Sequence, residues 1–247
     1  MPGYQTKQER VAIAGAGDLI IRSLRDRLQY VDPLGAAERQ GISSAMWPLF
    51  GLLWPSAAHL ASRLAARPVR ANERILEIGC GLALASLAAH RHGADVTASD
   101  CHPLAGAFLA ENARLNHLSP LTYRHGEWAD HDLPEDDDPV AAGTHVQGRF
   151  ELIVGSDLLY ERDASGILAG FIGRHAQAAA EVWIADPDRG NRPAFNRRMD
   201  ALGFARREER LDCAAGAGRP AYKGRLLIFT REAAGPASAP ARTSAAD

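Results

Sequence analysis

The 247-residue sequence is poor in cysteine, with three in total and no C-x-x-C pair among them. Closely spaced cysteines are typical of zinc sites, redox motifs and disulfide frameworks. These classes are therefore disfavoured, and a reducing compartment is indicated. The nine histidines are scattered, and His90 and His92 lie two residues apart on an expected helix, so they point to different faces. No metal site is expected.

The sequence also lacks a long hydrophobic run and an excess of charge of either sign. The mild apolar run at 11–17 is too short for a membrane span or a secretory signal. A formal net charge of -2 gives no basic field that would attract a nucleic acid duplex. We therefore expect a cytoplasmic protein without membrane insertion, and nucleic acid is disfavoured as its main partner.

The composition that is present, 46% hydrophobic and 23% charged, suits one α/β domain with appendages. Apolar runs alternate with helical stretches, which is typical of a mostly parallel sheet. Helices are expected at 82–92 and 103–117. Strands are expected at 74–79, 95–99, 121–124, 150–155 and 181–185, with a final antiparallel pair within 204–231. The predicted fold is α/β, a Rossmann-like sheet of seven strands with helices on both faces.

Three segments lie outside this rhythm. Residues 1–70 form an N-terminal extension or lid with an expected strand at 20–24, before a core at 71–231. Residues 232–247 are almost all Ala, Gly, Pro, Ser and Thr, which predicts a disordered tail. Residues 130–148 form an acidic insertion, for which a solvated loop and a dock for a lysine-bearing substrate both remain open.

Residues 75–83 have the sequence Ile-Leu-Glu-Ile-Gly-Cys-Gly-Leu-Ala. This pattern predicts a strand that ends in a glycine-rich turn and is followed by a helix. Such a turn exposes backbone N–H groups at the carboxyl edge of a sheet, where a nucleoside cofactor can lie. Asp100 ends the next strand and can bind both ribose hydroxyls. The dinucleotide fingerprint requires a small residue where Leu84 stands, so the match to it is poor.

S-Adenosylmethionine carries no pyrophosphate, and its site needs an acid before the glycines and small residues at alternate positions. Glu77, Gly79, Gly81 and Ala83 have this spacing, which resembles the E-x-G-x-G-x-G motif of class I methyltransferases. Ala83 replaces the third glycine, which is tolerable unless that residue needs a positive φ. The alternative is an ordinary strand-turn-helix corner with two turn glycines.

The strand at 150–155 runs directly into Ser156 and Asp157. In a doubly wound sheet its carboxyl end lies beside that of the glycine-rich strand, at the point where ligands bind. We therefore expect Asp157 and Tyr160 to face the methyl group of the cofactor. The alternative for Asp157 is a cap on the following turn.

Several segments resemble the seven-β-strand protein-lysine methyltransferases. Residues 157–160, Asp-Leu-Leu-Tyr, are similar to their DxxY motif, residues 51–56 to their N-terminal Trp segment, and 127–128 to the loop after strand three. Residues 186–190 resemble the DPxR loop of the electron-transfer flavoprotein β-subunit lysine methyltransferase branch. The resemblance implies S-adenosylmethionine as cofactor, an acceptor held by Asp157 and Tyr160, and cofactor contacts from Trp54, Glu77, Gly79, Gly81, Asp100 and Trp128.

Cys101, directly after Asp100, is also expected at the cofactor, where it and Cys80 would be small buried packing groups. The expected function is N-methylation of a lysine of a protein substrate, with Asp157 capturing and orienting the amine. A methyltransferase for a small-molecule amine or a nucleic acid remains open, as does a non-catalytic adaptor that binds S-adenosylmethionine.

Overall fold

The computed structural model describes residues 3–128, 145–160, 166–216 and 221–233. Most of the acidic insertion predicted at 130–148 and nearly all of the tail predicted at 232–247 therefore lie outside the described residues. In the described parts of the chain, none of the helices has the length and the apolar run needed to cross a bilayer.

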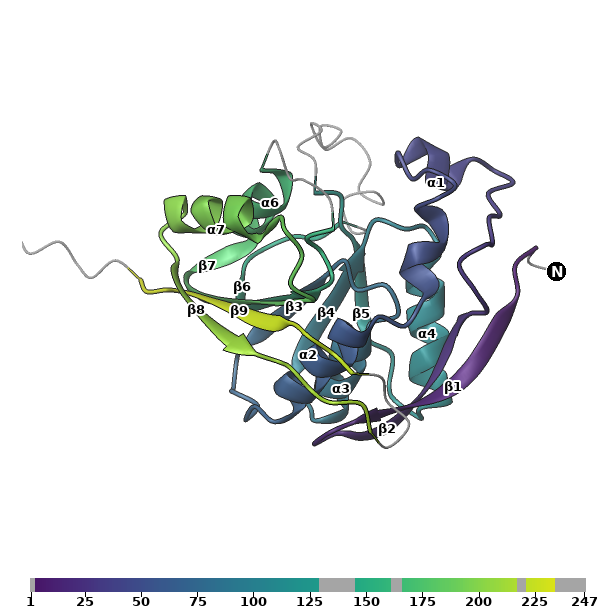
Figure 1. Cartoon of the computed structure of the whole chain (residues 1–247), viewed down its shortest axis with the longest axis horizontal. Helices are drawn as coiled ribbons and strands as arrows, with labels where there is room; N and C mark the ends of the chain where they lie inside the picture. The colour runs from purple at the N-terminus through teal and green to yellow at the C-terminus, as the bar shows by residue number, and fades with distance from the viewer. Residues whose placement is uncertain (1–2, 129–144, 161–165, 217–220, 234–247) are drawn as a thin grey trace, which may run out of the picture.

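A seven-stranded sheet in the order β5-β4-β3-β6-β7-β9-β8 forms the centre of the molecule (Figure 1). Neighbours from β5 to β7 pair in parallel, and β9 is antiparallel to both β7 and β8. The bounds are β3 Arg74–Ile78, β4 Asp95–Asp100, β5 Thr122–His125, β6 Phe150–Ser156, β7 Ala176–Asp186, β8 Ala205–Arg210 and β9 Arg225–Arg231. The predicted Rossmann-like architecture is confirmed.

Helices cover both faces of the sheet, and the strand side chains alternate between two buried cores. Leu152 and Val154 of β6 belong to one core, whereas Ile153 between them belongs to the other. The first core also receives α2 (Pro55–Ala65), α3 (Leu84–Arg91) and α4 (Ala105–Leu115). The second receives α6 (Ile167–His175) and α7 (Arg192–Ala201).

The N-terminal extension forms a separate antiparallel hairpin, β1 (Thr6–Ile13) with β2 (Gly17–Leu24), which lies against α4 (Figure 1). Two asparagines of α4 fasten it, since Asn116 Oδ1 accepts the N–H of Ile20 and Asn112 Oδ1 accepts that of Arg22, each at 2.8 Å. The strand predicted at 20–24 is present within β2, whereas β1 was not predicted. After the hairpin come the short helix α1 (Ala36–Arg39) and the 3-10 helix η1 (Trp47–Gly51).

Strand β3 pairs in parallel with β4 on one side and with β6 on the other, with Glu77 opposite Val154. The carboxyl ends of β3, β4 and β6 therefore lie side by side. This is the switch point at which open α/β sheets bind ligands. The site residues predicted from the sequence were expected at this edge.

Candidate functional site

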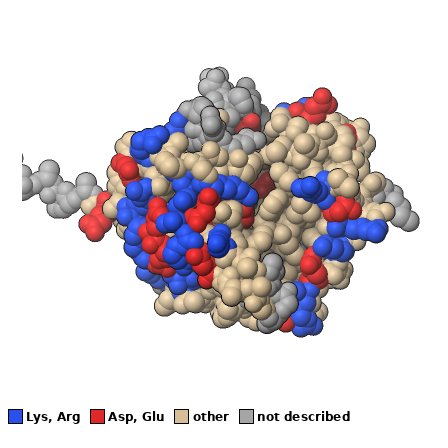
Figure 2. Space-filling view, in the orientation of Figure 1, with Lys and Arg blue, Asp and Glu red and all other residues tan. Residues whose placement is uncertain are grey.

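A cavity of about 480 Å³ opens at this carboxyl edge, a size typical of small-molecule sites. Its wall comes from the loops after β3, β4, β5, β6 and β7, together with the N-terminal segment 40–57. In the space-filling view of Figure 2, the visible surface of the molecule is hollowed near its middle. The structure brings nearly all of the predicted site residues to the wall: Trp54, Gly79, Gly81, Asp100, Cys101, Trp128, Asp157 and Tyr160.

The glycine-rich turn requires left-handed backbone at three alternate positions, with φ of +55° at Gly79, +51° at Gly81 and +58° at Ala83. A Cβ on Gly81 would lie 2.8 Å from the carbonyl oxygen of Phe50, so the close approach of the N-terminal segment also requires glycine. Ala83 therefore does sit at a positive φ, the condition under which alanine is unfavourable at this position. That conformation costs a non-glycine residue about 1 kcal/mol or more.

Glu77 lies beneath this turn and is not among the residues that line the cavity, so its direct contact with the cofactor stays a prediction. Its side chain is buried, and its Oε2 accepts hydrogen bonds from both the backbone N–H and the hydroxyl of Ser86 in the first turn of α3. Burial raises the pKa of Glu77 to about 7. Glu77 thus supports the turn and the start of α3 from behind.

Asp100 lies on the cavity wall and is 8% exposed. One carboxylate oxygen accepts the N–H of Gly81 and the other that of His102, each at 2.8 Å. Burial raises the pKa of this carboxyl. Because each carboxylate oxygen has a second lone pair, Asp100 can still accept hydrogen bonds from ribose hydroxyls.

The two cysteines of the site differ in exposure. Cys80 is buried as expected, whereas Cys101 is exposed on the cavity wall, so its predicted burial is wrong. Desolvation of the Cys101 sulfur by the surrounding cavity wall, together with the nearby Asp100 carboxylate, raises its pKa to about 12, and burial raises the pKa of Cys80. Because both thiols stay protonated near neutral pH, neither provides a thiolate nucleophile.

The two tryptophans predicted to touch the cofactor are half-buried and contribute to the wall. Trp54 precedes α2 and donates its indole N–H to the carbonyl of Leu49 at 2.9 Å. Trp128 packs over Gly79, where an added Cβ would lie 3.3 Å from its ring. By contrast, Trp47 is fully buried in the core.

Asp157 follows β6 with a left-handed backbone, φ +59°, and is 8% exposed. Its Oδ1 forms an ion pair with the Arg189 guanidinium at 2.9 Å, and Arg189 also donates to the Asp157 carbonyl at 3.2 Å. The N-cap of α6, the next helix in the described residues, is Gly166, which leaves a cap on the turn directly after Asp157 as an alternative role for this residue. Tyr160 lies at the rim of the cavity and is 45% exposed.

A protein-family model described as lysine methyltransferase matches residues 38–198, about two thirds of the chain. The chain belongs to the lysine methyltransferase family. The matched region includes the whole cavity wall described above, from Gln40 to Arg189. Membership confirms both the predicted family and S-adenosylmethionine as the cofactor.

Curated relatives in this lysine methyltransferase family are the electron transfer flavoprotein beta subunit lysine methyltransferases. That of Xenopus laevis is 28% identical over 145 residues, covering 58% of this chain and 53% of the relative. That of Danio rerio is 37% identical over 76 residues, covering 30% of each protein. The chain thus spans about half the length of the first curated relatives it matches.

Solved structures share the fold. The magnesium protoporphyrin IX methyltransferase of Synechocystis, with bound S-adenosylmethionine, superposes with a TM-score of 0.53 at 15% identity, covering 84% of this chain and 89% of that one. A 16S rRNA N2 methyltransferase of T. thermophilus gives 0.55 at 15% identity, covering 94% of this chain and 52% of that one. At this identity the likeness concerns the fold alone.

Several residues of this site were not predicted from the sequence. Arg189 had a signal, because it belongs to the segment that resembles the DPxR loop. The part of the cavity wall that comes from segment 40–57 had no sequence signal beyond its Trp-Pro pairs. Its residues include Gln40, Ile42, Met46, Leu49 and Phe50. His102 stacks on Phe50 with ring centroids 3.6 Å apart, and burial lowers its pKa to about 3, so this imidazole is neutral in the folded protein.

Proposed function

We propose that this chain transfers a methyl group from S-adenosylmethionine to the ε-amino group of a lysine in a protein substrate. The observation that carries the proposal is the placement of Asp157 and Tyr160 on the wall of the cavity that also holds the glycine-rich turn and Asp100. Family membership supports lysine as the acceptor.

When bound, S-adenosylmethionine would supply an electrophilic methyl carbon for the amine lone pair and a neutral thioether leaving group. The chain's own work is to bind and orient the amine and to release its proton. With an ordinary pKa near 10.4, a lysine amine is neutral in about one of several thousand molecules at pH 7, a cost of about 4 to 5 kcal/mol. The half-buried Trp54 and Trp128 limit water at the amine, which favours its neutral form.

Asp157 is suited to orient the amine. In the described parts of the chain, its Oδ2 is buried and has no hydrogen-bond partner, although the residue lines the cavity. An acceptor N–H would satisfy this oxygen. Tyr160, at the rim, can present its ring or its hydroxyl to the lysine side chain as it enters.

The first protein to test is the electron transfer flavoprotein β subunit of the source organism, because the curated relatives are named for that substrate. A small-molecule amine is the second candidate, since a cavity of this size also accommodates one. We also propose a reducing, cytoplasmic location, which the three free cysteines support.

The experiment is transfer from S-adenosylmethionine with a labelled methyl group, using the purified β subunit and, in parallel, a lysate of the host. After acid hydrolysis, we expect the label in Nε-methylated lysine. Label in a small amine or in nucleic acid would replace protein lysine with that acceptor. A protein that binds the cofactor and labels nothing would be the non-catalytic adaptor.

A further inference from the structure

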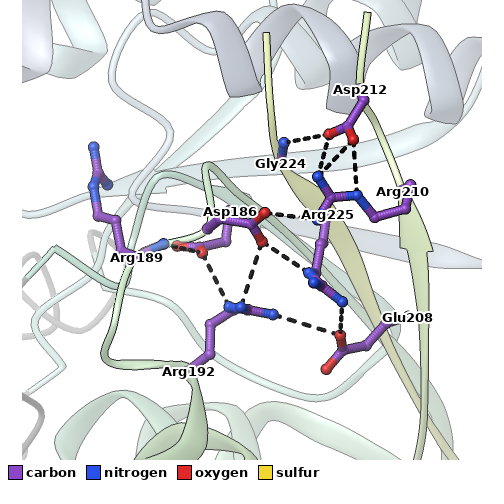
Figure 3. A network of polar contacts seen from close by, with 9 residues as sticks. Asp186, Arg189, Arg192, Glu208, Arg210, Asp212, Gly224 and Arg225 are labelled. Atoms are coloured by element: carbon purple, nitrogen blue, oxygen red, sulfur yellow. Dashed lines mark hydrogen bonds and ion pairs between the residues drawn. The ribbon is translucent and has the colours of Figure 1, made fainter.

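The loop between β7 and α7 carries Arg189 to the acceptor end of the cavity. The backbone N–H of Arg189 donates to Asp186 Oδ1 at 2.9 Å, which fixes the start of the loop. Asp188 fixes the next part, since its carboxylate pairs with Arg210 at 2.7 Å and with Arg225 at 2.8 Å. In Figure 3 the Arg189 side chain extends away from this cluster. A loop held from β8 and β9 therefore delivers a single guanidinium toward the cavity.

Arg189 binds only one side of Asp157. The guanidinium takes Oδ1 and the backbone carbonyl, at 2.9 and 3.2 Å, and leaves Oδ2 as the buried oxygen without a described partner. A bidentate contact would have used both carboxylate oxygens. The actual arrangement holds the carboxylate in one orientation and keeps one acceptor atom for a ligand.

Arg189 also changes the charge that an incoming amine would meet. A lone carboxylate favours the ammonium form of a nearby lysine, which cannot accept a methyl group. Here Asp157 pairs with Arg189, and the neighbouring Asp186 lies 3.6 Å from Arg192 of α7. The Asp157–Arg189 pair therefore sums to zero, whereas Arg192 is shared with two further acids, Asp188 at 3.4 Å and Glu208 at 3.5 Å.

The remaining titratable groups at the site are few. Tyr222, on the segment before β9, has its pKa raised to about 12 by burial and is neutral. His102 is neutral as described above. The other acids on the cavity wall are Asp100, the last residue of β4, and Glu127, on the loop after β5, both at the cofactor end. Asp100 is hydrogen-bonded to two backbone N–H groups of that end.

We propose that Arg189 is a positioning residue for methyl transfer. It holds Asp157 so that Oδ2 accepts a hydrogen from the acceptor amine, and it cancels the carboxylate charge so that the amine binds in its neutral, nucleophilic form. This inference rests on the proposed lysine transfer. The pair thereby binds a lysine amine without stabilising its ammonium form.

The test compares Arg189→Gln, which removes the charge, with Arg189→Lys, which keeps it. The exposed Arg206 on β8 supplies the matched control, Arg206→Gln. Initial rates are measured between about pH 7 and pH 9 with saturating S-adenosylmethionine. The acceptor is the electron transfer flavoprotein β subunit, or the host lysate if that subunit is not labelled.

We expect Arg189→Gln to lower kcat at least about tenfold near pH 7 and to move the alkaline rise of kcat up by about one pH unit. The deficit then shrinks toward high pH. Arg189→Lys restores the position of the pH profile, and Arg206→Gln leaves it unchanged. A purely structural role would lower kcat equally at every pH.

Two results would overturn the proposal. One is a pH profile of Arg189→Gln that parallels the wild type. The other is a loss of S-adenosylmethionine affinity of about tenfold or more by calorimetry, which would assign Arg189 to the cofactor instead. If the wild-type chain labels lysine in neither acceptor, the proposed function itself fails, so the two failures are distinguishable.

Discussion

Asp157 combines two unfavourable features, a left-handed backbone and a buried carboxylate oxygen without a described partner. Each costs on the order of 1 to 3 kcal/mol, and the folded protein retains such costs mainly where binding or catalysis depends on them. The ion pair with Arg189 offsets only part of this cost. The residue is therefore better explained by an acceptor amine than by stability.

Replacing Asp157 with asparagine keeps the size of the side chain and removes its charge. We expect Asp157→Asn to lower methyl transfer by about 100-fold, because the amine is no longer oriented, while S-adenosylmethionine affinity stays within about threefold. Rates with labelled donor and calorimetry measure the two effects. Asp95→Asn, exposed at the amino end of β4, is the control. Wild-type transfer by Asp157→Asn would refute the acceptor role.

Glu77 predicts a pH dependence of stability. Burial raises its pKa from 4.5 to about 7, so the folded state favours the protonated acid. The stability that this preference contributes is complete below the unfolded pKa and is lost as the pH rises through about 7. As the pH rises from about 5.5 to about 8, the wild type should therefore lose about 2 kcal/mol in free energy of unfolding that Glu77→Gln does not lose.

Urea unfolding of the wild type and Glu77→Gln at several pH values measures this difference. Parallel dependence of the two unfolding free energies on pH would mean that Glu77 is not buried as a carboxylic acid beneath the turn.

At the scale of elements, the glycine-rich turn depends on two separate properties of glycine, positive φ and the space that a missing Cβ leaves. Gly81 needs both, because its Cβ would meet Phe50. Gly93 has φ +84° and open space around it. We expect Gly93→Ala to lose about 1 kcal/mol of stability and Gly81→Ala to lose more, because its added Cβ also meets the Phe50 backbone. Only Gly81→Ala should lose about tenfold or more in S-adenosylmethionine affinity.

Unfolding in urea and calorimetry with the cofactor separate these two effects. Equal cofactor affinity in the two variants would show that the contact between the turn and the N-terminal segment has no role in binding.

Local patterns predicted the central strands well, because β3, β4 and β6 are short apolar runs bounded by turns. They failed where pairing partners decide the structure. Strand β1 contains charged residues that face solvent, and it forms because it pairs with β2. Strand β7 begins five residues before its predicted start, in an Ala-rich stretch that favours helix, because Ala180 pairs with Arg231 of β9.

At the scale of the whole molecule, the cavity joins segments far apart in the sequence. The carboxyl edge of the sheet was predictable from strand order, and with it Asp100 and Asp157. The wall from segment 40–57 was not, because a sequence does not show which distant segment packs over a turn. The same reason explains Arg189, whose partner Asp157 lies 32 positions earlier.

Because the cofactor contacts both the core and the N-terminal wall, its binding should stabilise the whole chain. At about 100 times its dissociation constant, S-adenosylhomocysteine should add about 2.7 kcal/mol and raise the melting temperature by about 5 to 10 °C. NAD should have no effect, since Leu84 occupies the position that a dinucleotide turn needs for a small residue. A thermal shift assay with both ligands checks this, and stabilisation by NAD alone would contradict it.

A crystal structure with S-adenosylhomocysteine and a lysine-bearing acceptor peptide tests the central claim most directly. We predict that the ribose hydroxyls bind Asp100, that the sulfur points toward the rim formed by Tyr160, and that the lysine amine donates to Asp157 Oδ2 while Arg189 stays on Oδ1. A cofactor bound outside this cavity, or a lysine that approaches without meeting Asp157, would contradict the account.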